Sequence, residues 1–145
     1  MLKTWMTVLA ALAMFTGCTN LSTLAPAGSM PRIEGTPGKA VVYLVRTRPD
    51  TSYLAAPVEL DGRMIGTDYA GTYFRLELTP GRHRLSGYAQ DSGAITLDVQ
   101  ADRIYFVQHS VAGSWRATNP NSFFTVISER RARAALTGTQ SAGNV

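Results

Sequence analysis

The sequence contains few of the residues that build metal or catalytic centres. It has one cysteine and two histidines, His83 and His109, among 145 residues. A single cysteine excludes an intrachain disulfide, and neither histidine occurs in the H-x-H or H-E-x-x-H spacing of metal sites. The G-x-S-x-G sequence of serine hydrolases is also missing, and no glycine-rich loop opens a helix to hold phosphate. These absences predict a protein that is not an enzyme and that holds no metal or cofactor.

Lysine is scarce as well, and arginine takes its place. Only Lys3 and Lys39 are lysine, against twelve arginines, and the formal net charge is +4. Arginine binds phosphate and carboxylate through a planar fork, which would suit anionic polymers, but a GC-rich genome explains the same bias. No recognition-helix pattern, zinc-finger spacing or RNA-binding aromatic motif is present, so we expect no nucleic-acid partner.

The N-terminus has the pattern of an export signal that ends at the only cysteine. A lysine at position 3 precedes an uncharged apolar run over residues 5–15, which is too short to span a bilayer as a helix. Thr16, Gly17 and Cys18 follow directly. Small residues before a cysteine resemble the lipobox of bacterial lipoproteins, and the resemblance implies cleavage between Gly17 and Cys18 and diacylation of the cysteine sulfur. The alternative is an ordinary secretory signal, but no A-x-A-like cleavage site lies nearby.

Residues 18–38 are expected to form a tether between the lipidated cysteine and a folded domain. Three prolines and three glycines lie in this segment, and they disfavour both a helix and a central strand. Position 19 is threonine rather than the aspartate that retains such lipoproteins in the inner membrane, which implies the cell outer membrane, on the periplasmic side. The expected organisation is a signal peptide over 1–17, a lipidated cysteine and tether over 18–38, a domain over 39–136 and a disordered tail over 137–145.

From residue 39 onward the sequence alternates as β-strands do. Residues 40–45 (AVVYLV) form an apolar run typical of a strand buried on both faces, and Asp61-Gly62 is a strong signal for a hairpin turn. Similar strand-like segments occupy residues 58–60, 63–65, 72–78, 82–89, 95–99, 104–111 and 122–127. The pattern predicts an all-β fold, a small antiparallel β-sandwich of immunoglobulin or prealbumin type with about seven to eight strands, or a partial barrel. His109, in phase with apolar neighbours, is expected to be half-buried and bonded to backbone.

A short helix is expected after the last of these strands. Ser128 can cap a helix over residues 129–136 (ERRARAAL), and Gly138 can close it. Its small and apolar residues share one face, so the helix should lie on the sheet with Arg130 and Arg133 in water.

The order of these segments resembles a family of bacterial lipoproteins. Residues 58–66 read V-E-L-D-G-R-M-I-G, and residues 71–85 read G-T-Y-F-R-L-E-L-T-P-G-R-H-R-L. With the AVVYLVR segment before them and Tyr105-Phe106-Val107 after them, they resemble the lipoproteins grouped as domain of unknown function 2846, and more loosely the PEGA-type β-domains. The resemblance covers roughly residues 39–136. It implies a β-sandwich lipoprotein and brings no catalytic residues.

Two loops are candidate contact surfaces. Trp115 and Arg116 lie in a polar, turn-rich segment between two expected strands, and exposed aromatic and arginine residues on a loop are typical of contact sites. The alternative is that Trp115 folds back into the core. Arg46, Arg48 and Tyr53, in the first long loop, form a second candidate patch, unless they are simply solvated loop residues.

These features favour a structural or interaction module at the cell envelope. The expected partners are the membrane, through lipid on Cys18, and another envelope protein or peptidoglycan. The alternative is a lipoprotein that holds a small molecule or an anionic glycan. A hydrolase would require a pair of titratable side chains that converge in a pocket.

Overall fold

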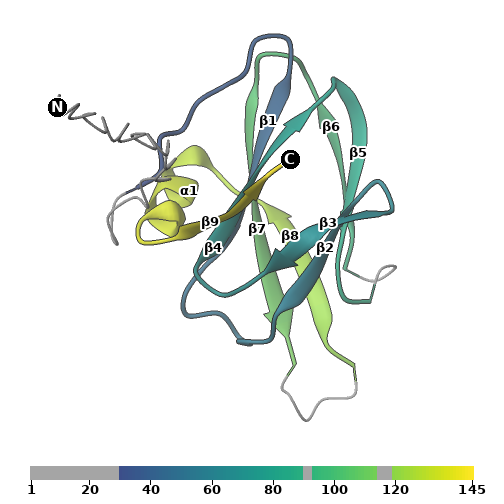
Figure 1. Ribbon diagram of the computed structural model, residues 1–145, viewed down its shortest axis with the longest axis vertical. Helices are drawn as coiled ribbons and strands as arrows, with labels where there is room; N and C mark the ends of the chain where they lie inside the picture. The colour runs from purple at the N-terminus through teal and green to yellow at the C-terminus, as the bar shows by residue number, and fades with distance from the viewer. Residues whose placement is uncertain (1–29, 90–92, 114–118) are drawn as a thin grey trace, which may run out of the picture.

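The computed structural model describes residues 30–89, 93–113 and 119–145, which form two β-sheets and one helix (Figure 1). A five-stranded mixed sheet has the order β8-β7-β1-β4-β9, and a four-stranded antiparallel sheet has the order β3-β2-β5-β6, and neither closes into a barrel. The elements are β1 (Ala40–Arg46), β2 (Ala56–Leu60), β3 (Arg63–Asp68), β4 (Thr72–Leu78), β5 (Gly81–Ser86), β6 (Ile95–Val99), β7 (Ile104–Ala112), β8 (Asn121–Val126), α1 (Glu129–Leu136) and β9 (Gln140–Asn144).

Local sequence signals explain the β2–β3 turn and the helix. Asp61 and Gly62 both have positive φ, 51° and 77°, as a type I′ turn requires. Ser128 caps α1 by accepting a hydrogen bond from the Arg131 backbone N–H, which confirms both the cap and the predicted span of 129–136. Within the described ranges, no helix is long and apolar enough to cross a membrane.

The main core lies between the two sheets. Inward-facing residues of β1, β4 and β7 meet those of β2, β5 and β6, and burial of this apolar surface drives the sheets together. The buried members are Ala40, Val42, Leu44, Val58, Phe74, Leu76, Leu78, Leu85, Leu97, Val99 and Val107.

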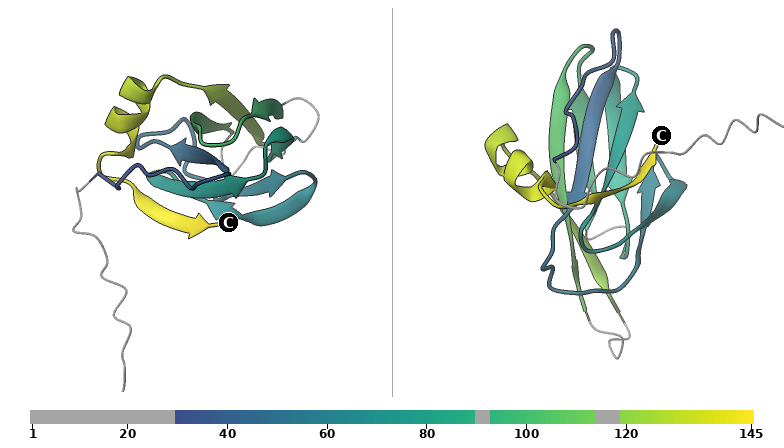
Figure 2. Two further views of the ribbon diagram at one scale, coloured as in Figure 1. Left: turned by 90° about the horizontal axis from the view of Figure 1, so that it is seen from above. Right: turned by 60° about the vertical axis from the view of Figure 1, so that its left-hand side comes forward.

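A second apolar cluster covers the outer face of the five-stranded sheet (Figure 2). Helix α1 contributes Ala132 and Leu136, which pack on β1 and β7, and Ile33 from the N-terminal segment packs beside them. The Tyr43 hydroxyl accepts a hydrogen bond from the Glu34 N–H and donates to the Arg32 carbonyl. Residues 40–45 are therefore buried on both faces of the sheet, as the apolar run predicted.

Three predictions about the architecture were wrong. The tether does not extend to residue 38, because Ile33 packs on the outer face of the sheet and Tyr43 bonds to the backbone of Arg32 and Glu34. The five-stranded sheet is not antiparallel throughout, because β1 pairs in parallel with β7 and β4 pairs in parallel with β9. The C-terminal segment is not a disordered tail, because Gln140–Asn144 forms β9, and the fold continues beyond residue 136. Its small polar side chains give little local signal, and the strand forms because its backbone hydrogen-bonds to β4 and to Gly71.

Candidate functional site

Arg46 lies at the end of the core between the sheets, and its burial overturns the prediction that it belongs to an exposed loop patch. It continues the inward face of β1 and has no exposed surface. Its Nε donates to Oδ2 of Asp50 at 2.7 Å, and its Nη1 donates to Oδ1 of Asp68 at 3.1 Å. Both carboxylates are almost fully buried, at 4% and 2% side-chain exposure. The guanidinium is thus paired with two acidic groups, as a buried charge must be.

The same guanidinium holds the backbone of the loop between β1 and β2. Arg46 donates to the carbonyl oxygens of Ser52 at 2.6 Å and of Leu54 at 2.7 Å. The loop is also joined to β7, since Thr51 Oγ1 donates to the Val111 carbonyl at 2.6 Å and the Val111 N–H donates to Asp50. These bonds fix loop 47–55 against the ends of the strands.

Asp68 continues the network to a buried histidine and serine. Asp68 Oδ2 lies 2.6 Å from Nδ1 of His109, and Nε2 of His109 lies 2.9 Å from Oγ of Ser122. Because Asp68 also accepts from Arg46, we assign the proton to Nδ1, which leaves Nε2 to accept the Ser122 hydroxyl proton. The ring stacks on Phe124 with centroids 4.4 Å apart.

This order of groups is that of a Ser-His-Asp triad, but the serine is enclosed. Ser122 has no exposed surface, and its Oγ accepts the Tyr88 N–H at 2.9 Å. Gly87 packs so closely that a Cβ there would lie 2.4 Å from Oγ. A Cβ at Gly93 would lie 1.7 Å from the Ser122 carbonyl oxygen. The Ser122 hydroxyl is thus enclosed in this conformation, and the three side chains form a hydrogen-bonded part of the core.

Sequence reasoning missed this network and misplaced two of its members, Arg46 and His109. His109 was expected to be half-buried and bonded to backbone, but it is fully buried and bonds two side chains. A usable signal existed, because His109 and Ser122 are polar residues in the inward phase of apolar strands. Across the described residues, no buried side-chain nitrogen or oxygen lacks a hydrogen-bond partner, and no group of three metal-ligating side chains occurs.

Several loops meet at this end of the sheets. Loop 47–55 and Tyr69 lie together because Arg46 also contacts the backbone carbonyl of Asp68. Tyr53 is 67% exposed and Tyr69 is 53% exposed. Arg48 is exposed too, and it lies against Gly71 at the start of β4. We call this surface, made by Arg48, Tyr53 and Tyr69, the loop end.

Other predicted site residues fall outside the described part of the chain. Trp115 and Arg116 belong to residues 114–118, and Gly17 and Cys18 belong to residues 1–29. The strands that flank 114–118, β7 and β8, both terminate at the loop end, as Figure 1 shows.

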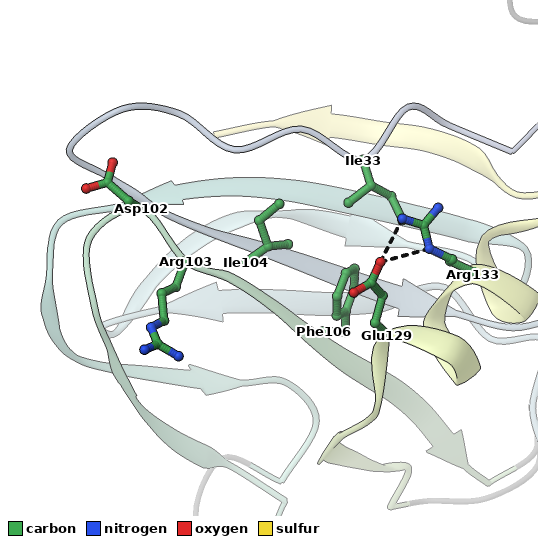
Figure 3. A pocket seen from close by; sticks show the side chains of 7 residues that line it. All are labelled: Ile33, Asp102, Arg103, Ile104, Phe106, Glu129 and Arg133. Carbon is green, nitrogen blue, oxygen red and sulfur yellow. Dashed lines mark hydrogen bonds and ion pairs between the residues drawn. The ribbon is translucent and has the colours of Figure 1, made fainter.

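A groove of about 480 Å³ lies beside α1, on the outer face of the five-stranded sheet (Figure 3). Ile33, Ile104 and Phe106 supply its apolar surface. Glu129 and Arg133 form an ion pair at 2.7 Å on one side, and Asp102 and Arg103 lie on the other. In the described residues Arg103 is exposed and has no ion-pair partner.

A titratable pair joins two turns at the opposite end from the loop end. His83 lies 2.7 Å from Asp61 through Nδ1 and 2.8 Å from the Thr79 carbonyl through Nε2. Burial opposes the charged form of His83, but the bonds to Asp61 and Thr79 outweigh it and raise the pKa of His83. Burial likewise opposes ionisation of Asp61, but bonds from the Arg84 N–H and from His83 lower the pKa of Asp61.

Comparison with known proteins assigns no class to this arrangement. No family model, curated protein or solved structure matches the chain. The function therefore has to be inferred from the residues themselves.

Proposed function

We propose that this chain is a lipid-anchored lipoprotein of the cell outer membrane, and that its domain is a non-enzymatic interaction module facing the periplasm. The lipobox-like sequence before Cys18 supports the anchor, and the two sheets support a sandwich of immunoglobulin or prealbumin type. The order of motifs supports a relationship with the domain of unknown function 2846 lipoproteins. In this proposal the partner is another envelope protein or peptidoglycan.

One observation carries the assignment of the contact surface. The buried network of Arg46 holds the backbone of loop 47–55 in a fixed position while Tyr53 and Arg48 stay exposed. Side chains on a rigid backbone support bind without the entropic cost of ordering the loop, and tyrosine adds contact area at low side-chain entropy, which favours tight contacts. The enclosed hydroxyl of Ser122 supports a role without catalysis.

The test compares two pairs of exposed residues in the full-length protein in cells. The loop-end pair Arg48→Ser with Tyr53→Ser is compared with the control pair Arg63→Ser with Met64→Ser on the β2–β3 hairpin. Tyr53 and Met64 match in exposure, at 67% and 63%. After crosslinking in cells, the loop-end pair should reduce partner capture at least about tenfold, since central contacts often contribute 2 kcal/mol or more, and the control pair should not. Equal partner capture by both variants would refute the loop end as the contact surface.

A second candidate function is a lipoprotein that binds a small molecule or anionic glycan. The groove beside α1 favours it, because apolar residues and Arg103 line the same hollow. A ligand present at 100 times its Kd should stabilise the protein by about 2.7 kcal/mol, which a thermal shift screen would detect.

A further inference from the structure

The described chain begins beside helix α1. Residues 30–36 cross the outer face of the five-stranded sheet, where Tyr43 bonds to the backbone of Arg32 and Glu34. The first described residues lie on the side of α1, as Figures 1 and 2 show. Residues 19–29 alone lie between Cys18 and Met30. A segment of that length reaches about 40 Å at full stretch and averages about 18 Å as a coil. An anchor at Cys18 would therefore bring this face within reach of the membrane without fixing the orientation of the domain.

This face carries a surplus of unpaired positive charge. Arg103, Arg130 and Arg131 are exposed and form no ion pair within the described residues. On α1 the only acidic residue is Glu129, which Arg133 neutralises. Asp102 is the remaining acid on the groove rim, and it accepts the Gly38 N–H.

The shape of α1 allows close approach to a flat surface. Its buried residues, Ala132 and Leu136, face the sheet. Arg130 and Ala134 are exposed and lie on the side of the helix opposite to Ala132 and Leu136. Positions two apart in the sequence are rotated by about 200° around the helix axis, and positions four apart by about 40°. The outermost side chains are thus a small residue and an arginine. The long arginine side chain can reach a phosphate group without any movement of the helix backbone.

We infer that the α1 face rests on an anionic phospholipid surface, with Arg103, Arg130 and Arg131 contacting head-group phosphates. The inference rests on the proposed lipid anchor, because the anchor brings this face within reach of the membrane. Each arginine near an anionic bilayer strengthens binding about fivefold. The contact orients the domain, and it does not replace the anchor.

The experiment uses the lipidated full-length protein in vesicles. Acylation occupies Cys18, so a single new cysteine can carry a fluorophore, at Ala134→Cys on α1 or, as control, at Thr96→Cys on β6. Both positions are exposed. Vesicles contain phosphatidylcholine with or without one third phosphatidylglycerol, and quenchers are attached to the lipid. The label at position 134 should be quenched several-fold more than the label at position 96, in anionic vesicles only. Salt at 1 M screens interactions between charges more than about 3 Å apart, so it should abolish the difference in quenching. The double change Arg130→Glu with Arg131→Glu should abolish the difference as well.

The outcomes separate the anchor from the orientation. Release of the protein from vesicles in 1 M salt would overturn the lipid anchor and this inference together. Retention with equal quenching of both labels, or with the same quenching in neutral vesicles, would overturn the orientation and leave the anchor standing. Disulfide crosslinking of two copies of unlabelled Ala134→Cys, together with no quenching of the labelled protein, would assign the face to a second copy and would also overturn the inference.

Discussion

Replacing Arg46 with methionine tests whether the buried network holds the loop end. Methionine keeps most of the aliphatic length but removes the charge that pairs with Asp50 and Asp68, whose side chains are 4% and 2% exposed. Removing one partner of a buried ion pair typically costs about 3–5 kcal/mol, because the remaining charge stays unpaired. In a domain of about 100 residues, 1 kcal/mol shifts Tm by about 4–8 °C. We therefore expect Arg46→Met to lower Tm by at least about 12 °C.

Arg48→Met is the matched control two residues away. Arg48 is exposed, and substitutions at such positions usually stay within about 0.5 kcal/mol, so Tm should change by no more than about 4 °C. Urea denaturation of both variants gives the free energy of unfolding directly. Hydrogen exchange adds a local measure, since the amides of loop 47–55 should lose protection in Arg46→Met. Equal stability of the two variants would refute the network as the support of the loop.

Three further predictions address the turns, the last strand and the anchor. The pair of His83 and Asp61 should stabilise the fold most between about pH 4 and pH 6.5. Its contribution is lost as the pH rises through the raised pKa of His83 and as it falls through the lowered pKa of Asp61. The Tm difference between wild type and His83→Gln should accordingly be larger near pH 6 than near pH 9. Deleting residues 140–145 should lower the free energy of unfolding in urea by about 2 kcal/mol or more, because several backbone hydrogen bonds to β4 are lost. Cys18→Ser should leave an unprocessed precursor at the inner membrane, and normal processing in cell fractionation would contradict the lipobox.

The parts of the fold that the sequence predicted are those with local causes. Helix α1 needs only its cap, Ser128, and its own apolar stripe, and the β2–β3 turn needs only Asp61-Gly62. The burial of residues 40–45 in β1 was also predictable, because six consecutive apolar residues leave no polar face.

The candidate site depends on contacts between distant residues, and these gave no local pattern. Arg46 stands next to a turn-like segment, and its burial is decided by Asp68, which is 22 residues away. Asp68 meets His109 across 41 residues. β9 has no hydrophobic alternation that would predict a strand. It forms by pairing with the open edge of β4, which the local sequence does not show. Inward-phase polar residues are the signal that would indicate such a network in a β-rich sequence.

The parallel pairing of β1 with β7 has a consequence for the order of folding. Val41 pairs with Ile104, so the central ladder of the larger sheet closes across 63 residues of chain. Ladders between such distant segments fold slowly, because the entropy of a large loop is lost before the contacts form. If the chain is exported unfolded and N-terminus first, as the proposed signal peptide would require, its central strand has no parallel neighbour until residues 104–112 have followed. The topology would thus delay compaction until most of the chain has been translocated, and the last ladder to close, between β4 and β9, requires residues 140–144.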